Sequence, residues 1–279
     1  MREKRVIRVS ILAICAAFAC SACAQNSAEE AAAPAHRLLI AGDSTAADYP
    51  VERAPQIGWG QVIDYYLSDD VVVLNRAVNG RSTKSYIDEG RWDSLMEELQ
   101  PGDFVIISFG HNDSRDDAPE RYGAPDGAYR DNMAAFAEAV EAAGGTAILM
   151  SPPARRLWEG PAMVETHGLY RLNAGIAAEQ AGVEFIDLSQ LSIDYFESIG
   201  QEQTKTDFLW LSPETANERF PDGVEDNTHF TEIGACGVAR LIAERLPEDL
   251  VETANFDEAD ADEDGRPDDV PACAALAWD

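Results

Sequence analysis

The sequence is poor in positive charge and especially in lysine. Among its 279 residues, 21 are Lys or Arg against 51 Asp or Glu, which gives a formal net charge of −30. A surface this acidic repels nucleic acid and anionic lipid, so we expect neither as a partner. We interpret the acidity as a contribution to solubility.

Cysteine is also scarce, and several hydrolase motifs are missing. Beyond residue 24 the chain has no CxxC pair, and it has no H-E-x-x-H spacing anywhere, so neither motif supplies a metal site in the expected domain, and we expect no cofactor. It also lacks the G-x-S-x-G elbow of α/β-hydrolases. Three of the five cysteines lie in the first 23 residues. The other two, Cys236 and Cys273, are plausible disulfide partners in an oxidising compartment, where they would tie the acidic end to the last expected helix.

The amino terminus has the pattern of a secretory signal peptide. Basic residues in 1–8 precede the apolar run Val9–Ala19, and small residues follow up to Ala24. This run is too short to cross a bilayer, and no other run is long enough, so we expect no transmembrane span. We predict a signal peptide over 1–24, a linker over 25–36, and export to the periplasm or beyond the cell. Lipid anchoring through Cys23 is the alternative.

The rest of the chain fits one α/β domain over 37–250, followed by an acidic segment over 251–279. The expected strands are 37–42, 71–78, 103–110, 146–151 and 183–188, and the expected helices are 58–67, 92–99, 128–143, 169–181 and 230–246. The strands are nearly continuous apolar runs, which is typical of a parallel sheet covered on both faces. We therefore predict a three-layer α/β fold around a doubly wound, five-stranded parallel sheet.

Polar turns follow three of the expected strands. Ser44 comes after the first strand, the turn 79–82 after the second, and 111–113 (His-Asn-Asp) after the third. Serine beside glycine and aspartate is ordinary turn chemistry, so Ser44 alone indicates little. Ligands of doubly wound sheets bind at the carboxyl ends of the strands. Three polar turns at that edge therefore favour an active site.

Asp226 and His229 are candidate partners for a serine nucleophile. A spacing of three residues can place both side chains on one side of a turn, where the carboxylate fixes the imidazole tautomer. A serine hydroxyl is a weak nucleophile unless such a base takes its proton. The Asp-x-x-His spacing is a weak signal by itself and gains weight only together with the polar turns.

Four sequence motifs, taken in order, resemble those of the SGNH (GDSL) hydrolase superfamily. They are Gly42-Asp43-Ser44, Gly80, Gly110-His111-Asn112-Asp113 and Asp226-x-x-His229. Longer blocks at 75–93, 102–113, 165–173 and 221–235 resemble the rhamnogalacturonan acetylesterase-like branch. The resemblance covers roughly residues 37–246 and implies a flavodoxin-like sheet.

The resemblance also implies a role for each motif residue. Ser44 would be the nucleophile, His229 the general base and Asp226 its orienting carboxylate. The amides of Ser44 and Gly80 and the side chain of Asn112 would form the oxyanion hole, which stabilises charge that appears only during the reaction. These roles imply a serine esterase that removes O-acetyl groups from plant cell-wall polysaccharide of the pectin, rhamnogalacturonan type.

Two other functions stay open, and the partner would differ between them. One is a GDSL-type lipase or thioesterase that cleaves other acyl esters at the same serine. The other is a glycan-binding protein without catalysis, which the complete set of motif residues disfavours. The expected partner is an acetylated polysaccharide or oligosaccharide, and we expect a monomer.

Further side chains are candidates for substrate contacts. His167 and Arg81 are candidate substrate-binding residues, and each has a purely structural alternative. The tryptophans Trp92, Trp158 and Trp210 would either stack on sugar rings or belong to the core. His111 could contribute to a metal site with His229, but we favour a structural role in which it supports Asn112.

The acidic end contains a pattern that resembles a calcium loop. Asp260, Asp262, Asp264 and Asp268, with Gly265, stand at EF-hand-like offsets, but Pro271 occupies the position of the bidentate glutamate. A calcium loop and a solvated acidic tail both stay open.

Overall fold

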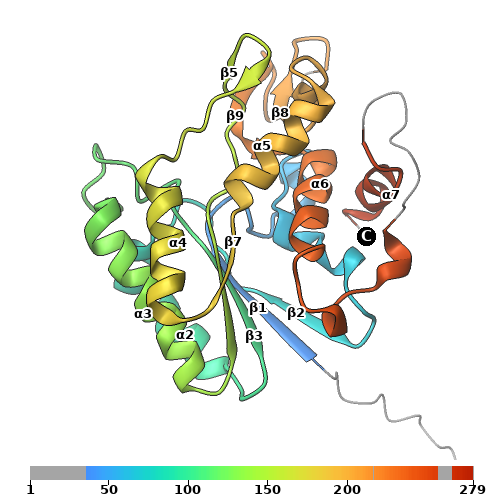
Figure 1. The fold of residues 1–279 in the computed structure, drawn as a ribbon. Helices are drawn as coiled ribbons and strands as arrows, with labels where there is room; N and C mark the ends of the chain where they lie inside the picture. The colour runs from blue at the N-terminus through green and yellow to red at the C-terminus, as the bar shows by residue number, and fades with distance from the viewer. Residues whose placement is uncertain (1–35, 216, 257–265, 279) are drawn as a thin grey trace, which may run out of the picture. The chain divides into compact units, whose positions relative to one another are not determined.

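The computed structural model describes residues 36–215, 217–256 and 266–278 (Figure 1). Its centre is a parallel sheet in the spatial order β2-β1-β3-β4-β7, which confirms the predicted doubly wound α/β fold. The strands are β1 (His36–Gly42), β2 (Val71–Asn75), β3 (Phe104–Ser108), β4 (Thr146–Met150) and β7 (Glu184–Ile186).

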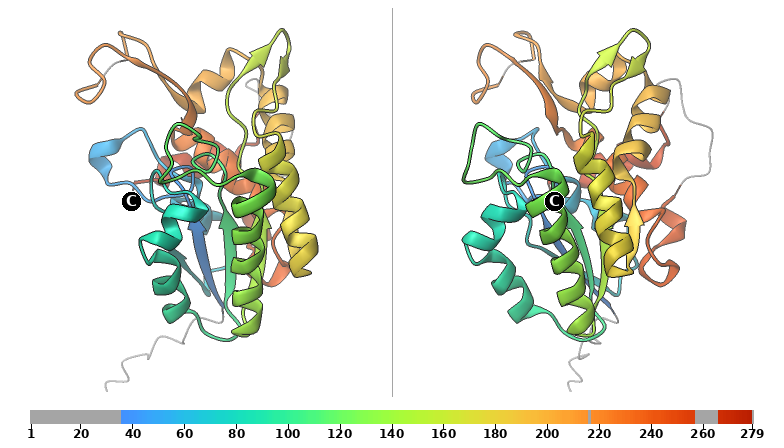
Figure 2. Two further views of the ribbon diagram at one scale, coloured as in Figure 1. Left: turned by 90° about the vertical axis from the view of Figure 1, so that its left-hand side faces the viewer. Right: turned by 60° about the vertical axis from the view of Figure 1, so that its left-hand side comes forward.

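Helices cover both faces of this sheet (Figures 1 and 2). They are α1 (Thr83–Asp88), α2 (Arg91–Glu98), α3 (Arg130–Ala142), α4 (Leu169–Ala181), α5 (Leu188–Ile199), α6 (Glu232–Ala243) and α7 (Asp269–Leu276). Leu39 and Val105 pack in one core with α1 to α4. Leu38 and Ile106 pack in the other core with α5, α6 and α7. Because adjacent strand residues are buried on opposite faces, the strands are apolar throughout.

Two small antiparallel elements and several short turns complete the described fold. The hairpin joins β5 (Trp158–Glu159) to β6 (Ala162–Met163), and a longer ribbon joins β8 (Phe208–Leu211) to β9 (Val224–Phe230). Figure 2 shows both at the end of the sheet where the parallel strands finish. The 3-10 turns are Val51–Arg53, Trp59–Gln61, Ile63–Tyr66, Gln203–Thr206, Glu248–Leu250 and Thr253–Asn255, and the π-turn Pro125–Tyr129 leads into α3.

The structure differs from the sequence prediction in several elements. The helix expected over 58–67 is two 3-10 turns, because the backbone here lies against residues 46–47: a Cβ on Gly58 would come within 2.4 Å of the Ala47 carbonyl oxygen. Helix α5 and the β8–β9 ribbon were not predicted, and the closing helix begins at Glu232 rather than at residue 230.

Parts of the acidic end pack against the domain. Helix α7 lies on α6, and a disulfide bond joins Cys236 of α6 to Cys273 of α7. The buried Arg266 forms an ion pair with the buried Asp207. The segment 251–279 therefore includes a packed helix, whereas the sequence-based alternative was a solvated acidic tail.

The calcium pattern and the amino-terminal expectations fall mostly outside the described residues. Asp260, Asp262 and Asp264 lie there, whereas Asp268 directly precedes α7. Within the described ranges no group of three or more His, Cys, Asp or Glu side chains is arranged to hold a metal ion. The same ranges contain no helix that is both long and apolar enough to cross a membrane. The predicted signal peptide, Cys23 and the linker up to residue 35 also lie outside them.

Candidate active site

The three polar turns lie at one edge of the sheet. Strand β1 is paired with β3 so that Gly42 lies opposite Ser108, and the chain leaves both strands directly after these residues. The Val78 amide bonds to the Gly42 carbonyl, which brings the turn after β2 to the same edge. This parallel pairing places 43–45, 79–82 and 111–113 as neighbours, as expected from the sequence.

The turn that carries Ser44 is held by its neighbours. Asp43 Oδ1 accepts hydrogen bonds from the backbone amide and the hydroxyl of Thr45, both at 2.9 Å. The Tyr49 hydroxyl donates to the Ser44 carbonyl oxygen at 2.9 Å. Ser44 itself is 5% exposed. These contacts fix its backbone and leave the side-chain hydroxyl free to point at a partner.

That partner is His229, and Asp226 lies behind it. His229 Nε2 lies 2.9 Å from Ser44 Oγ, and His229 Nδ1 lies 2.7 Å from Asp226 Oδ2. The other carboxylate oxygen, Oδ1, accepts the backbone amides of Thr228 at 2.8 Å and His229 at 3.0 Å. Strand β9 carries both Asp226 and His229, so the ribbon missed by sequence reasoning is the element that brings them to Ser44.

The electrostatics keep the Asp226 carboxyl ionised. Burial alone would raise its pKa, but the hydrogen bond and charge of His229 and the two backbone amides bring the pKa below its usual value. An ionised carboxylate holds the imidazole proton on Nδ1. The lone pair of Nε2 then faces the Ser44 hydroxyl, which is the geometry that a serine nucleophile and its general base would require.

Gly80 and Asn112 lie close together at the same edge. Gly80 has φ of +77°, a backbone conformation that favours glycine. The Asn112 side-chain amide donates one hydrogen bond to the Arg81 carbonyl oxygen at 3.1 Å. A side-chain amide has two N–H groups, so a second donor of Asn112 is available. Ser82 then begins α1 with a reciprocal capping box formed with Ser85, which fixes where this turn ends.

Two buried acids, Asp43 and Asp113, belong to the turns themselves. Asp113 accepts the Thr83 amide at 3.0 Å and so ties the turn after β3 to α1. Burial raises the pKa of Asp113 to about 7, although the hydrogen bonds from Thr83 oppose the shift. Burial likewise raises the pKa of Asp43, against the hydrogen bonds from Thr45. A pKa of about 7 limits the negative charge that Asp113 carries near the place where an oxyanion would form.

The candidate substrate contacts have different surroundings. The Arg81 guanidinium is bonded to Glu89 at 3.0 Å and to the Asn79 carbonyl oxygen at 2.8 Å. His167 is 4% exposed, and burial lowers its pKa to about 4. Trp92 is a core residue that stacks on Phe136.

The remaining tryptophans belong to the small antiparallel elements. Trp158 is half-buried on the β5–β6 hairpin. Trp210 is half-buried on β8, where its indole N–H donates to Asn227 at 3.0 Å. Of the three tryptophans, these two lie at the end of the sheet that carries the candidate site.

His111 is buried in the neutral form. Burial lowers its pKa well below the usual value, and the positive charge of Arg155 acts in the same direction. Within the described residues neither ring nitrogen has a hydrogen-bond partner. Its ring packs edge-on against His167 with ring centres 4.7 Å apart. The structure therefore places His111 among packed side chains, next to Asn112 in the chain.

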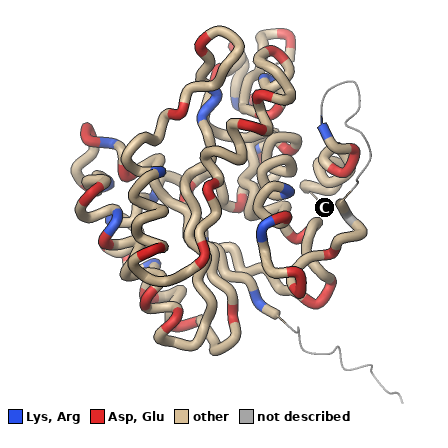
Figure 3. The backbone as a smooth tube through the Cα atoms, viewed as in Figure 1, with Lys and Arg blue, Asp and Glu red and all other residues tan. Residues whose placement is uncertain are grey.

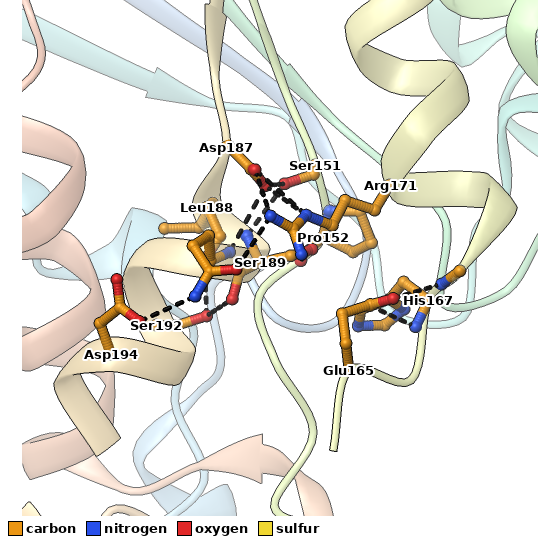
Figure 4. A network of polar contacts seen from close by, with 12 residues as sticks. Ser151, Pro152, Glu165, His167, Arg171, Asp187, Leu188, Ser189, Ser192 and Asp194 are labelled. Atoms are coloured by element: carbon orange, nitrogen blue, oxygen red, sulfur yellow. Dashed lines mark hydrogen bonds and ion pairs between the residues drawn. The ribbon is translucent and has the colours of Figure 1, made fainter. Parts of the chain in front are cut away.

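A polar network that the sequence did not reveal fixes the segment after β4 (Figure 4). Ser189 Oγ donates to the Pro152 carbonyl at 2.6 Å, and His167 Nε2 lies 2.8 Å from the Pro153 carbonyl. The Ala154 amide donates to Ser192 Oγ at 2.8 Å. Three successive residues are thus held before the chain reaches Arg155.

Asp187 anchors the same network. It accepts the Ser151 hydroxyl at 3.0 Å and pairs with the Arg171 guanidinium through both carboxylate oxygens, at 2.9 and 2.6 Å. This segment leads to Arg155, whose guanidinium donates a hydrogen bond to the His111 carbonyl oxygen at 3.4 Å. His167 and Arg171 lie in the block 165–173, but no local pattern reveals the network itself, because it joins β4, α4 and α5 only in the folded chain.

The chain belongs to the GDSL-like lipase/acylhydrolase family, whose model matches residues 40–236. It is similar to the rhamnogalacturonan acetylesterase RhgT of Bacillus subtilis, with 35% identity over 76% of this chain and 90% of that protein. A rhamnogalacturonan acetylesterase of Emericella nidulans is 30% identical over 74% of this chain and 82% of its own. The protein is therefore a carboxylic ester hydrolase.

Solved structures share the fold. The protein YxiM of Bacillus subtilis superposes with a TM-score of 0.64 and 26% identity, covering 76% of this chain and 56% of its own. The acetylxylan esterase Axe2 of Geobacillus stearothermophilus superposes with a TM-score of 0.51 and 17% identity, covering 78% and 97% of the two chains. At 17% identity the second likeness concerns the fold alone.

Proposed function

We propose that this enzyme is exported and removes O-acetyl groups from plant cell-wall polysaccharide, a pectin of the rhamnogalacturonan type. The observation that carries the proposal is the hydrogen-bonded series from Ser44 Oγ through His229 to Asp226, with contacts of 2.9 and 2.7 Å. The choice of substrate is supported by the printed names of relatives that match most of the chain.

In the proposed reaction, His229 Nε2 takes the proton of Ser44 as Oγ forms a bond to the acetyl carbonyl carbon. The negative charge on the carbonyl oxygen meets the amides of Ser44 and Gly80 and the free N–H of Asn112. Collapse of the intermediate breaks the bond to the sugar oxygen, which receives the proton from His229. Water, activated by the same imidazole, then releases acetate and restores Ser44. Asp226 orients His229 and stabilises its cationic form.

The test compares wild type with Ser44→Ala, measuring acetate released from acetylated rhamnogalacturonan, acetylated xylan and acetylated homogalacturonan. We expect release by wild type alone, and most rapidly from rhamnogalacturonan. A folded Ser44→Ala variant that matches wild type would refute the serine mechanism. Equal release from all three polymers would refute the substrate assignment.

Acyl length separates the proposal from a lipase or thioesterase. A series of 4-nitrophenyl esters from acetate to decanoate should show falling kcat/KM with chain length. Turnover of long chains at least as rapid as that of acetate would favour the alternative. Glycan binding without turnover of any ester would favour a binding protein.

A further inference from the structure

An arginine from the segment after β3 covers Gly80. A Cβ built on Gly80 would have the Arg121 guanidinium as its nearest neighbour, with Nη1 at 3.6 Å and Cζ at 3.8 Å. The guanidinium therefore lies beside the space that a side chain at Gly80, the residue proposed for the oxyanion hole, would fill. A ligand seated at Gly80 is within reach of this charge.

The Arg121 guanidinium is poorly engaged by the protein itself. Its one ion pair among the described residues is with Glu120, next to it in the chain, at 3.7 Å, and this glutamate side chain is 68% exposed. No hydrogen bond to the guanidinium is formed within the same ranges. By contrast, Arg115 holds Asp117 through two hydrogen bonds, at 2.8 and 2.9 Å. Arg121 thus keeps donors for a ligand while its side chain is 39% exposed.

The backbone that carries Arg121 is fixed. Its amide donates to the Ala118 carbonyl at 2.8 Å, and the Gly123 amide donates to the Asp113 carbonyl at 3.1 Å. The Tyr170 hydroxyl donates to the Gly123 carbonyl at 3.0 Å. A preordered segment loses less conformational freedom when a ligand binds.

The charge of the surroundings makes this position distinctive. Acidic residues dominate the chain, and Figure 3 shows them spread over its helices and loops. A guanidinium with free N–H groups in a fork matches a carboxylate, which it can bind through two hydrogen bonds. Arg81, the other arginine beside Gly80, is already occupied by Glu89.

We propose that Arg121 forms a carboxylate-binding subsite beside the oxyanion hole and gives the enzyme a preference for esters on uronate-containing glycans. This inference rests on the proposed function, and it assigns one residue to one chemical feature of the substrate. Arg121 acts here as a specificity-determining residue. The acetyl carbonyl lies at Gly80 while the carboxylate of the same sugar or its neighbour meets the guanidinium.

The test uses an acetylated rhamnogalacturonan oligosaccharide and the same oligosaccharide with its galacturonate carboxyl groups methyl-esterified. For wild type, Arg121→Gln, Arg121→Lys and the control Arg115→Gln, kcat/KM is measured on both. We expect Arg121→Gln to lower the ratio of the acidic to the neutral substrate about tenfold, mainly through KM, because a hydrogen bond between charged groups at a partly exposed site is worth about this much. Arg121→Lys should retain part of the preference, and Arg115→Gln all of it.

Two results would overturn the inference. One is an unchanged ratio in Arg121→Gln. The other is an equal fall in kcat on both substrates, which would assign the charge to the oxyanion instead.

Inhibition of 4-nitrophenyl acetate turnover by unacetylated oligogalacturonate separates this inference from the proposed function. If wild type releases no acetate from either glycan, the proposed substrate is wrong. Inhibition that weakens about tenfold in Arg121→Gln would still support the subsite, whereas no inhibition of wild type would refute it.

Discussion

Replacement of Asp226 by asparagine tests how the imidazole is held. Asp226 Oδ1 accepts two backbone amides, from Thr228 and His229, so the carbonyl oxygen of an asparagine would take that place. Its NH2 group would then occupy the position of Oδ2, 2.7 Å from His229 Nδ1. Two N–H groups cannot face each other, so the imidazole proton must move to Nε2. A protonated Nε2 cannot accept the proton of Ser44, which lies 2.9 Å away.

The expected loss follows from that wrong tautomer. A triad whose carboxylate becomes an amide loses about 10⁴ in kcat, which corresponds to about 5 kcal/mol of transition-state stabilisation. Stability should change far less, by about 1 kcal/mol, because the asparagine oxygen still accepts both backbone amides. Asp226→Ala would also leave those two amides without this acceptor, and should cost about 1–3 kcal/mol more.

The assay is kcat for 4-nitrophenyl acetate together with the free energy of unfolding in urea. Asp222→Asn is the matched control, because Asp222 is an exposed acid in the same β8–β9 ribbon. We expect the control to match wild type in both measurements. An Asp226→Asn variant within tenfold of the wild-type kcat would refute the idea that this carboxylate sets the tautomer.

Three further predictions concern stability. His167→Gln removes an imidazole whose pKa burial lowers to about 4. As the pH falls below about 6.5, the usual pKa of histidine, the unfolded chain binds a proton there and the folded protein does not, so wild type loses stability on acidification. Its urea unfolding free energy relative to the variant should therefore fall by about 2 kcal/mol between about pH 7.5 and about pH 5. A constant difference would contradict the lowered pKa. Cys236→Ser with Cys273→Ser opens a loop with a sequence separation of 37, and should lower the unfolding free energy by about 3–4 kcal/mol; a loss below about 1 kcal/mol would show that the packing of α7 suffices. In Gly80→Ala the new Cβ has room, but the alanine must keep φ of +77°, which is unfavourable for a residue with a side chain. The unfolding free energy from thermal unfolding should therefore fall by about 1–2 kcal/mol. An unchanged unfolding free energy would mean that the turn can adopt another conformation.

The parallel sheet is predictable from the sequence because its strands are buried on both faces. Leu38, Leu39 and Ile40 are all fully buried, so the apolar run has no interruption. Strand β9 lacks that signal, since it carries mainly polar residues and lies outside the parallel sheet, where β8 is its strand partner. Helix α5 is obscured because Ser189 and Ser192 face inward, where they bond to the segment after β4.

The candidate site is predictable only where it lies close to strand ends. Ser44 and Asn112 follow their strands directly, so the register of the sheet determines where they lie. Neighbours in the chain mislead elsewhere: Arg81 adjoins Gly80, yet its guanidinium turns to Glu89. Arg121 reaches Gly80 from a later segment whose course depends on the packing of Tyr170 and Asp113. No sequence period encodes such a course.

The three residues of the proposed catalytic series lie on two separate parts of the fold, strand β9 and the turn after β1. Asp226 and His229 share one strand and are joined through backbone and side chain, whereas Ser44 belongs to the other part. A single hydrogen bond therefore forms the joint between them. The ribbon reaches the segment after β1 through Phe230, whose carbonyl accepts the Ile57 amide. Detachment of the β8–β9 ribbon would separate His229 from Ser44 and leave His229 paired with Asp226. Heat inactivation should therefore occur when this ribbon detaches, before the parallel sheet unfolds.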